Sequence, residues 1–297
     1  MPELPDIEAY RTALEDRVLG QPLVRARIIS FSVLKTFDPP IEDLHGQEVT
    51  ATRRLGKRVC VGFAPDRWIV IHLMITGRLR WYDEAGKAVP KKVGHGAFDF
   101  PSGTLLLTEQ GTKKRAGIWV HGSWDAAVDE HDRGGVEPLE LDLAAFREAL
   151  TRENRTVKRA LTDPRILSGI GNAFSDEILL AAYLSPVKTT SRLDQDEFER
   201  LYRATQDVLT TWTDRLVAEA HDTFPEKVTA FREEFGAHGR YGQPCPQCGD
   251  PIQRIRYADN ETNYCATCQT GGKLLADRAL SRILKDDWPR SLDELDA

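Results

Sequence analysis

The spacing of hydrophobic and polar positions changes along the chain. In residues 6–20, DIEAYRTALEDRVLG, apolar side chains recur every three or four residues, which predicts one amphipathic helix ending near Gly20. From Leu23 to Val120 apolar and polar residues alternate in short runs such as VRARIIS, KRVCVGF and RWIVIHL, separated by Gly, Pro and Asp. This second pattern predicts short antiparallel strands in a sandwich or barrel.

Helical spacing returns in the second half of the chain, in LAAFREAL, TVKRALTD, NAFSDEILLAAY and EFERLYRATQDVLTTWTDRLVAEA. The preceding segment, HGSWDAAVDEHDRGGVEPLELD, is rich in charged and turn residues, so we interpret it as the connection between two domains. Near the end of the chain, LLADRALSRILKDDW predicts one further amphipathic helix.

These patterns predict an α+β protein with four parts. An N-terminal helix and an antiparallel β-sandwich occupy residues 1–130, and a helical domain occupies residues 138–238. A cysteine-containing hairpin follows at 239–272, and residues 273–297 form a C-terminal helical extension.

The distribution of charge favours a nucleic-acid partner more than the net charge does. The formal charge of the 297-residue chain is -6, which argues mildly against a polyanion. Between Ala51 and Arg115, however, thirteen Lys or Arg residues stand against five Asp or Glu. This basic region is either a solvated charged surface or the electrostatic footprint of a nucleic-acid-binding protein.

The sequence predicts neither a signal peptide nor a membrane-spanning segment. Apolar stretches such as WIVIHLMITG end after about ten residues, whereas a membrane span needs roughly 18. The first residues lack the basic start and apolar run of a signal peptide. We therefore expect a cytoplasmic protein without a membrane partner.

Four of the five cysteines form two CxxC pairs. Cys245 and Cys248 are followed, after sixteen intervening residues, by Cys265 and Cys268. Each pair presents two thiolates from one tight turn, and two pairs complete a tetrahedral zinc site with no open position. We expect one structural Zn²⁺ ion; a redox dithiol is the alternative, disfavoured because neither pair lies between a strand and a helix.

The segment Gly169-Ile170-Gly171-Asn172 separates two predicted helices. Its glycines allow close backbone approach, Asn172 can cap the second helix, and the free N–H groups at a helix start attract anions. The segment is either an ordinary helix–helix connection or a clamp for a DNA phosphate.

Pro2 and Glu3 could carry unusual chemistry at the start of the chain. If Met1 is removed, Pro2 presents a secondary amine that can attack C1′ of a nucleoside, displace the base and permit strand cleavage by β-elimination. Glu3 could then transfer protons, for example at the sugar ring oxygen. The alternative is an ordinary frayed terminus.

Five segments follow one another along the chain: PELPD, RRLGKRV (53–59), HLMITGRLR (72–80), LTDPRILSGIGN (161–172) and the CxxC pairs. Together they resemble the formamidopyrimidine-DNA glycosylase and endonuclease VIII family, and the resemblance runs from Pro2 to about Gln269. The resemblance implies an N-terminal helix and β-sandwich, a helix-two-turns-helix domain and a zinc hairpin. It also implies a bifunctional base-excision repair enzyme, a DNA glycosylase and abasic-site (AP) lyase, that flips the damaged nucleotide out of the duplex.

Residue roles follow from the same resemblance. Pro2 matches the Schiff-base nucleophile and Glu3 the general acid, while Lys57 matches a hairpin lysine that contacts phosphate and assists catalysis. Asn172 matches the phosphate-binding asparagine of the helical motif, and Lys158 lies at a family position near the lesion strand.

Other family positions hold different residues here. Asp6 stands where the family usually has glutamate, and the His72-to-Ile75 segment, HLMI, replaces HLGM, so that Ile75 takes the place of the wedging methionine. In the loop that faces the orphaned base, Lys114 and Ala116 replace an arginine and a phenylalanine, on either side of Arg115. Asn260 occupies the position of the hairpin arginine, for which Arg254 or Arg256 could substitute. The residues expected to contact DNA are thus Lys57, His72, Ile75, Lys114, Arg115, Lys158, Asn172 and Asn260.

We therefore expect a monomeric, nucleoid-associated enzyme whose partner is damaged double-stranded DNA. Two alternatives stay open: a protein that binds damaged or abasic DNA with weak or no turnover, and a glycosylase for an unusual lesion.

Overall fold

The computed structural model describes residues 1–226, 228, 232–257, 260–276, 283–284, 289–292 and 294. Its packing divides the chain into two compact units, Met1–Arg133 with Thr211–Thr229, and Gly134–Thr210 with Ala230–Ala297. The first unit thus includes a segment that the sequence boundaries assign to the helical domain. Leu216, Ala220 and Phe224 of that segment are buried in the core of the first unit.

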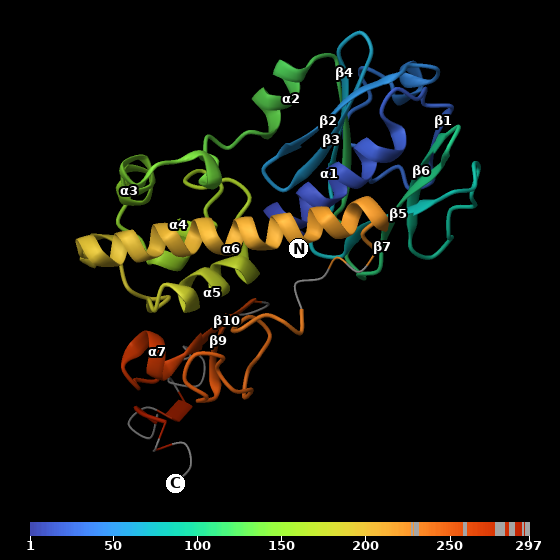
Figure 1. The fold of residues 1–297 in the computed structure, drawn as a ribbon. Helices are drawn as coiled ribbons and strands as arrows, with labels where there is room; N and C mark the ends of the chain where they lie inside the picture. The colour runs from blue at the N-terminus through green and yellow to red at the C-terminus, as the bar shows by residue number, and fades with distance from the viewer. Residues whose placement is uncertain are drawn as a thin grey trace. The chain divides into compact units, whose positions relative to one another are not determined.

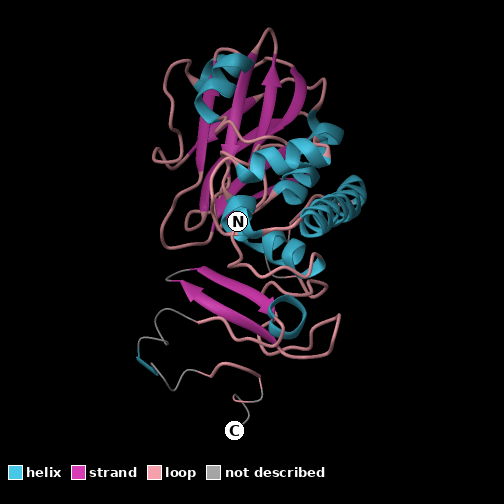
Figure 2. Cartoon of the chain, turned by 90° about the vertical axis from the view of Figure 1, so that its left-hand side faces the viewer, coloured by secondary structure: helices cyan, strands magenta, loops and turns pink. Residues whose placement is uncertain are grey.

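The first unit contains two four-stranded sheets in which every pairing is antiparallel, as predicted. Figure 2 shows their strands in magenta. One sheet has the order β1 (Arg25–Ile28), β6 (Gly94–Phe100), β7 (Gly103–Glu109) and β5 (Gly77–Tyr82). The other has the order β2 (Val49–Leu55), β3 (Arg58–Phe63), β4 (Arg67–His72) and β8 (Gly117–His121).

The N-terminal helix α1 (Leu4–Val18) packs against β2 and β3 (Figure 1). Pro5 lies in its first turn, where its missing N–H has no partner to lose. The helix and the inward-facing residues of both sheets share one core, which includes Tyr10, Val61 and Leu105. The antiparallel sandwich with an N-terminal helix is therefore confirmed, and the short 3₁₀ helix η1 (Ile41–Leu44) lies between β1 and β2.

The interpretation of residues 121–142 as turn-rich was wrong for one part of the segment. Helix α2 (Trp124–His131) forms there, and the side chain of Ser123 caps it by accepting a hydrogen bond from Ala126 N at 3.1 Å. Only Ala127 and His131 of this helix are buried. Trp124, Ala127, Val128 and His131 have helical spacing, but they span only two turns within a charged segment. A helix this short is marginal on its own, so it depends on packing against β4 and β8.

The second unit is helical with a β-hairpin (Figure 1). Its elements are η2 (Pro138–Glu140), α3 (Leu143–Thr151), α4 (Val157–Thr162), α5 (Asn172–Ala181), η3 (Thr190–Arg192), the first part of α6 (Gln195–Asp222), β9 (Ile252–Tyr257), β10 (Asn260–Cys265) and α7 (Ala266–Thr270). Residues 277–282 and 285–288 of the predicted C-terminal helix lie outside the described residues. Within the described part of the chain, no helix has the length and apolar character needed to cross a membrane.

Candidate functional site

The first residues are held by the start of α1. Glu3 is its N-cap, and the Glu3 N–H donates to Asp6 Oδ2 at 2.9 Å, while the Glu3 carboxylate accepts from the Asp6 backbone in return. Pro2 is buried, and Glu3 and Asp6 are each 3 % exposed. This reciprocal capping box argues against a frayed terminus, and it forms although Asp6 is one methylene shorter than glutamate.

The electrostatic surroundings of this terminus favour a neutral amine. Burial lowers the pKa of the Met1 α-amino group, and Arg78 and Lys57 lower it further, against the opposing charges of Glu3 and Asp6. Burial also lowers the pKa of Lys57, in the turn between β2 and β3, and Glu3 opposes that shift. The structure thus brings the chain terminus, Glu3 and Lys57 within electrostatic reach of one another, and an amine here loses its proton more readily than in water.

His72 and Ile75 belong to the end of β4 and the turn that follows it. His72 pairs with Arg58 on β3 and with Gly117 on β8. Burial, helped by the charges of Arg58 and Lys57, lowers the pKa of His72 to about 4. Ile75 is 53 % exposed at the turn, so an apolar side chain is presented to solvent there.

The lowered pKa of His72 predicts a steeper loss of stability in acid. The folded pKa, about 4, lies below the unfolded value of about 6.5, so the unfolded state binds more protons between these two values. The stability that the neutral ring contributes is fully present above pH 6.5 and is lost as the pH falls toward 4. Between pH 7.5 and 4.5 we expect the wild type to lose about 2–3 kcal/mol more unfolding free energy than His72→Gln, measured by urea denaturation. If the unfolding free energies of the two proteins changed with pH by the same amount, the lowered pKa of His72 would be contradicted.

Glu109 is a site residue that the sequence analysis missed. Its carboxylate, 1 % exposed, accepts hydrogen bonds from the backbone N–H groups of Arg115 and Ala116 at 3.0–3.2 Å. It also binds Thr76 Oγ1 at 3.2 Å and His95 Nε2 at 2.9 Å. Burial alone would raise the pKa of Glu109, but these hydrogen bonds outweigh burial and hold the pKa below its usual value.

Glu109 therefore joins two turns that the sequence analysis assigns to DNA contact. Thr76 follows Ile75 in the turn after β4, and Arg115 and Ala116 belong to the loop before β8. Lys114 and Arg115 are exposed on this loop, and the Lys114 ammonium donates to the Glu109 carbonyl oxygen. The one available signal was that Glu109 is one of only five acids in the basic region between Ala51 and Arg115. The sequence alone offered no partner for its carboxylate.

In the second unit the structure brings Lys158 and Asn172 together. The ammonium of Lys158, 13 % exposed, donates to Asp176 Oδ1 at 2.5 Å, to Ser175 Oγ at 2.8 Å and to the Asn172 carbonyl oxygen at 3.1 Å. Asp176 is fully buried and also contacts His238 Nδ1 at 2.7 Å and Asn263 N at 3.2 Å. This network connects α4 and α5 with the hairpin.

The expectation that Asn172 caps its helix was wrong. Gly171 is the N-cap of α5, and Asn172 is the first helical residue. The side-chain amide of Asn172 donates instead to the Glu261 carbonyl oxygen on β10 at 2.7 Å. Asn172 thus fastens the helix start to the hairpin, and one of its two amide hydrogens is used in doing so.

The buried ion pair predicts a large cost for Asp176→Asn. This change keeps the shape of the side chain but leaves the Lys158 ammonium buried without a counter-charge, so we expect the unfolding free energy of the second unit to fall by about 3–5 kcal/mol in urea denaturation. Glu199→Gln serves as control, because Glu199 and Arg203 form an exposed pair at 3.8 Å, worth at most about 0.5 kcal/mol. Equal losses in the two variants would refute the argument.

Asn260 is exposed at the start of β10. Arg254 and Arg256, on the facing strand β9, both lie near the Glu261 carboxylate, at 3.5 and 3.7 Å. Arg254 also stacks on Tyr241, with its guanidinium carbon 3.9 Å from the ring centre. Arg256, 61 % exposed, is the more accessible of the two arginines to a phosphate.

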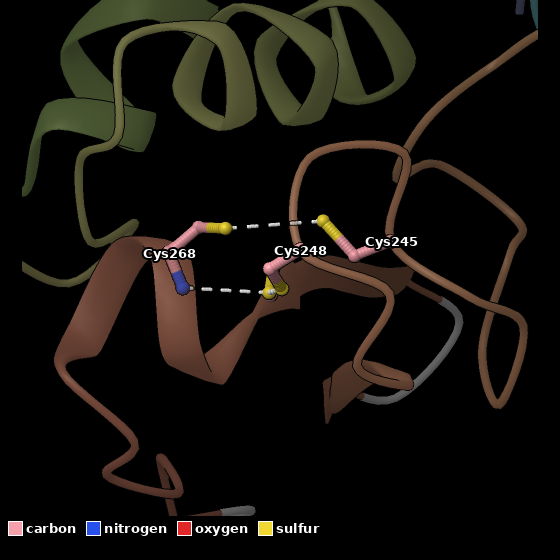
Figure 3. Close-up of side chains that lie close together, drawn as sticks. Cys245, Cys248 and Cys268 are labelled. Carbon is pink, nitrogen blue, oxygen red and sulfur yellow. Dashed lines mark hydrogen bonds between the residues drawn. The ribbon is translucent and has the colours of Figure 1, made fainter.

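The four CxxC cysteines converge at the other end of the hairpin. The expectation that neither pair lies between a strand and a helix was wrong for the second pair, because Cys265 ends β10 and Cys268 lies in α7. Their sulfur atoms all lie within 4.8 Å of one another, with Cys245 and Cys268 at 3.9 Å and Cys248 and Cys265 at 3.4 Å. Figure 3 shows Cys245 and Cys248 reaching from a loop and Cys268 from α7 toward a common centre. Tetrahedral zinc with Zn–S bonds of roughly 2.3 Å places its sulfurs roughly 3.8 Å apart, so the donor set fits Zn²⁺.

The order of these elements matches known protein families. Residues 1–114 match the formamidopyrimidine-DNA glycosylase N-terminal domain, and residues 135–215 match the helix-two-turns-helix domain of the same enzyme. Residues 242–271 match the zinc finger found in formamidopyrimidine-DNA glycosylase and isoleucyl-tRNA synthetase.

Whole-length relatives agree with these matches. The formamidopyrimidine-DNA glycosylase of Heliobacterium modesticaldum is 31% identical over 280 residues, covering 91% of this chain and 100% of the relative. The Lactococcus lactis enzyme solved with DNA containing N7-benzyl-Fapy-dG is 25% identical, with a TM-score of 0.79, and covers 91% of this chain and 100% of that one. The chain belongs to the formamidopyrimidine-DNA glycosylase and endonuclease VIII family.

Proposed function

We propose that this protein is a DNA glycosylase of base excision repair that uses Pro2 to remove a damaged base and then nicks the strand as an AP lyase. The observation that carries the proposal is the ordered, buried terminus, where Pro2 precedes a capped helix with Glu3 and Lys57 in electrostatic reach. Solved relatives in complexes with abasic-site and Fapy-dG DNA support DNA of this kind as the substrate class.

The proposed chemistry starts after Met1 is removed. The Pro2 nitrogen forms a bond to C1′ as the glycosidic bond breaks and the base departs with a proton. Protonation of the ring oxygen O4′ then breaks the C1′–O4′ bond and opens the sugar, which leaves an iminium ion between C1′ and the Pro2 nitrogen. This iminium ion acidifies C2′–H, and loss of that proton breaks the C3′–O bond and expels the 3′ phosphate, which is β-elimination. Hydrolysis of the iminium then releases Pro2. Glu3, beside the amine, donates a proton at the sugar ring oxygen, and Lys57 stabilises the nearby phosphate charge.

Contacts with the duplex are proposed for residues of both units. In the first unit Lys57, Lys114 and Arg115 supply charge, His72 supplies a neutral ring, and Ile75 fills the space left by the flipped nucleotide. In the second unit the start of α5 at Asn172, supported by Lys158, binds a phosphate, and Asn260 lies at the tip of the hairpin. The proposed working form is a monomer on damaged double-stranded DNA.

A structural Zn²⁺ ion is proposed at Cys245, Cys248, Cys265 and Cys268. Bound there, it cross-links the loop before β9 to the start of α7 and leaves no coordination position for a reactant. Its role is therefore to hold the hairpin in shape.

Borohydride reduction tests the proposed function. In the presence of duplexes that carry an abasic site or one oxidised base, the protein should form a covalent adduct, because reduction converts the iminium ion into a stable amine. Duplexes with each of the four bases opposite the lesion complete the panel. Failure to trap an adduct with any duplex, at protein concentrations that saturate binding, would remove the proposal and favour a damage-binding protein without turnover.

One observation favours an altered lesion or opposite-base preference. Ala116 aligns with the wedging phenylalanine of the family, and it is 2 % exposed, so its side chain does not project into the stack. Ile75 then acts without that second wedge. Rates of base removal that vary little with the base opposite the lesion would support this altered preference. Strong discrimination among the four opposite bases would contradict it.

A further inference from the structure

The first unit holds a second cluster of metal-ligating side chains, distinct from the CxxC cysteines of the second unit. His121, at the end of β8, and Glu130 and His131, at the end of α2, each offer a ligand atom within 4.8 Å of the others. The two Nε2 atoms of the histidines are 3.1 Å apart, and Glu130 Oε2 is 4.0 Å from His121 Nδ1.

Packing holds the two histidines in this position. The outer face of the β2-β3-β4-β8 sheet carries Trp68 and Trp119, and α2 covers it through Ala127 and Trp124. The Trp119 ring meets His131 edge-on at 4.9 Å, and the two imidazoles meet at 82°. His121 and His131 are 6 % and 4 % exposed, whereas Glu130 is exposed and can turn toward them.

The two histidine nitrogens have the spacing of ligands on one divalent ion, and a carboxylate oxygen of Glu130 lies within 4.8 Å of the ligand nitrogens. Zn–N bonds of roughly 2.0–2.1 Å at tetrahedral angles place two nitrogen ligands roughly 3.3 Å apart, close to the 3.1 Å between the histidines. A hydrogen bond between the rings satisfies one N–H, but the 4.0 Å from His121 to Glu130 is too long for a second. We propose that His121, Glu130 and His131 bind a second Zn²⁺ ion, which fastens the end of α2 to the end of β8.

The charges around the cluster set the strength of this site. The cations Arg58 and Arg133 act on His131 and oppose a bound Zn²⁺, and Glu130 provides a single negative charge. Four thiolates are softer and more strongly charged ligands than two imidazoles and a carboxylate. The second ion therefore binds more weakly than zinc at the cysteine site, and a chelator removes it first.

Zinc content and zinc affinity test the proposal on the full-length protein. After saturation with Zn²⁺ and removal of unbound metal, elemental analysis should find one more ion per chain in the wild type than in His131→Asn. Calorimetric titration with Zn²⁺ after mild chelation should show binding that weakens by more than about tenfold in His131→Asn and His121→Asn. His221→Asn, at a histidine of α6 that is 55 % exposed, is the matched control and should keep the wild-type zinc content.

A substitution at an exposed residue tests the site without the risk that the variant misfolds. Glu130 is exposed, so Glu130→Gln leaves the fold intact, and we expect it to weaken Zn²⁺ binding by about tenfold. Far-ultraviolet circular dichroism without added zinc checks that each variant is folded. Wild-type zinc content in folded His131→Asn, together with unchanged affinity in Glu130→Gln, would overturn the site.

Discussion

Changing Pro2 is expected to remove covalent trapping on DNA while leaving binding to damaged DNA nearly unchanged. Pro2→Gly keeps a terminal amine but makes it primary. The restraint of the ring is then lost, and the Schiff base that glycine forms can lose its remaining N–H proton to become a neutral imine, which acidifies C2′–H less than the permanently charged iminium ion of proline. We expect single-turnover base removal to fall by about 10³-fold, or about 4 kcal/mol of transition-state stabilisation. Pro2→Glu, whose bulky second residue favours retention of Met1, should give no adduct with borohydride.

Binding measurements separate this chemical effect from a structural one. Both Pro2 variants should bind a non-cleavable abasic-site analogue within about threefold of the wild type, a difference of less than about 0.7 kcal/mol. Mass spectrometry of the intact proteins establishes which N-terminus each carries. Wild-type trapping by a protein shown to retain Met1 would exclude Pro2 as the nucleophile.

Loss of a zinc ligand is expected to have the second-largest effect. In isolated zinc fingers the metal contributes about 10–16 kcal/mol to folding, far more than a small hairpin can supply from its own core. Cys265→Ala should therefore release zinc and unfold the segment that contains β9, β10 and α7. Because Asn172 bonds to β10, the start of α5 loses its support as well. We expect DNA affinity to fall by at least about 100-fold, or about 2.7 kcal/mol, in an electrophoretic mobility assay.

Cys60→Ala is the matched control for this experiment. Cys60 is buried in the first unit, beside Trp68 and Val70, and belongs to no CxxC pair. This variant should keep the wild-type zinc content at the hairpin and bind DNA as the wild type does. Full DNA affinity in a zinc-free Cys265→Ala protein would show that the hairpin does not contribute to binding.

Local periodicity predicted the elements whose own residues determine them. The strands around Cys60, Ile69 and Leu105 are short apolar runs bounded by turn residues, so an antiparallel sandwich followed from the sequence. The cysteine spacing predicted the convergence of four sulfurs. Helix α2 was missed because its stability comes from the sheet beneath it. The long pattern of α6 is continuous, so it does not reveal that residues from Thr211 onward pack in the other unit.

The hydrogen-bond partners of the buried polar side chains could not be predicted from the pattern of hydrophobic and polar residues. Lys158 was expected near the lesion strand, and the structure pairs it with Asp176, eighteen residues away along the chain. Glu109 contacts Thr76 across thirty-three residues and Ala116 across seven. Such hydrogen bonds depend on which strands become neighbours, and a single sequence does not report that. Where the resemblance supplied roles, for Pro2, Glu3 and Lys57, the structure supplies a shared environment for them.

The capped, buried start of α1 has a consequence for how the protein is made. In the folded chain Pro2 is buried and the capping box of Glu3 and Asp6 is closed, so a processing peptidase has little access to the Met1–Pro2 bond. If Pro2 is the nucleophile, Met1 must be removed while the nascent chain is still extended. Removal of Met1 then competes kinetically with folding in each molecule. A molecule that folds before Met1 is removed stays inactive for its lifetime. The active fraction would depend on the rate of synthesis, and rapid overproduction would lower it.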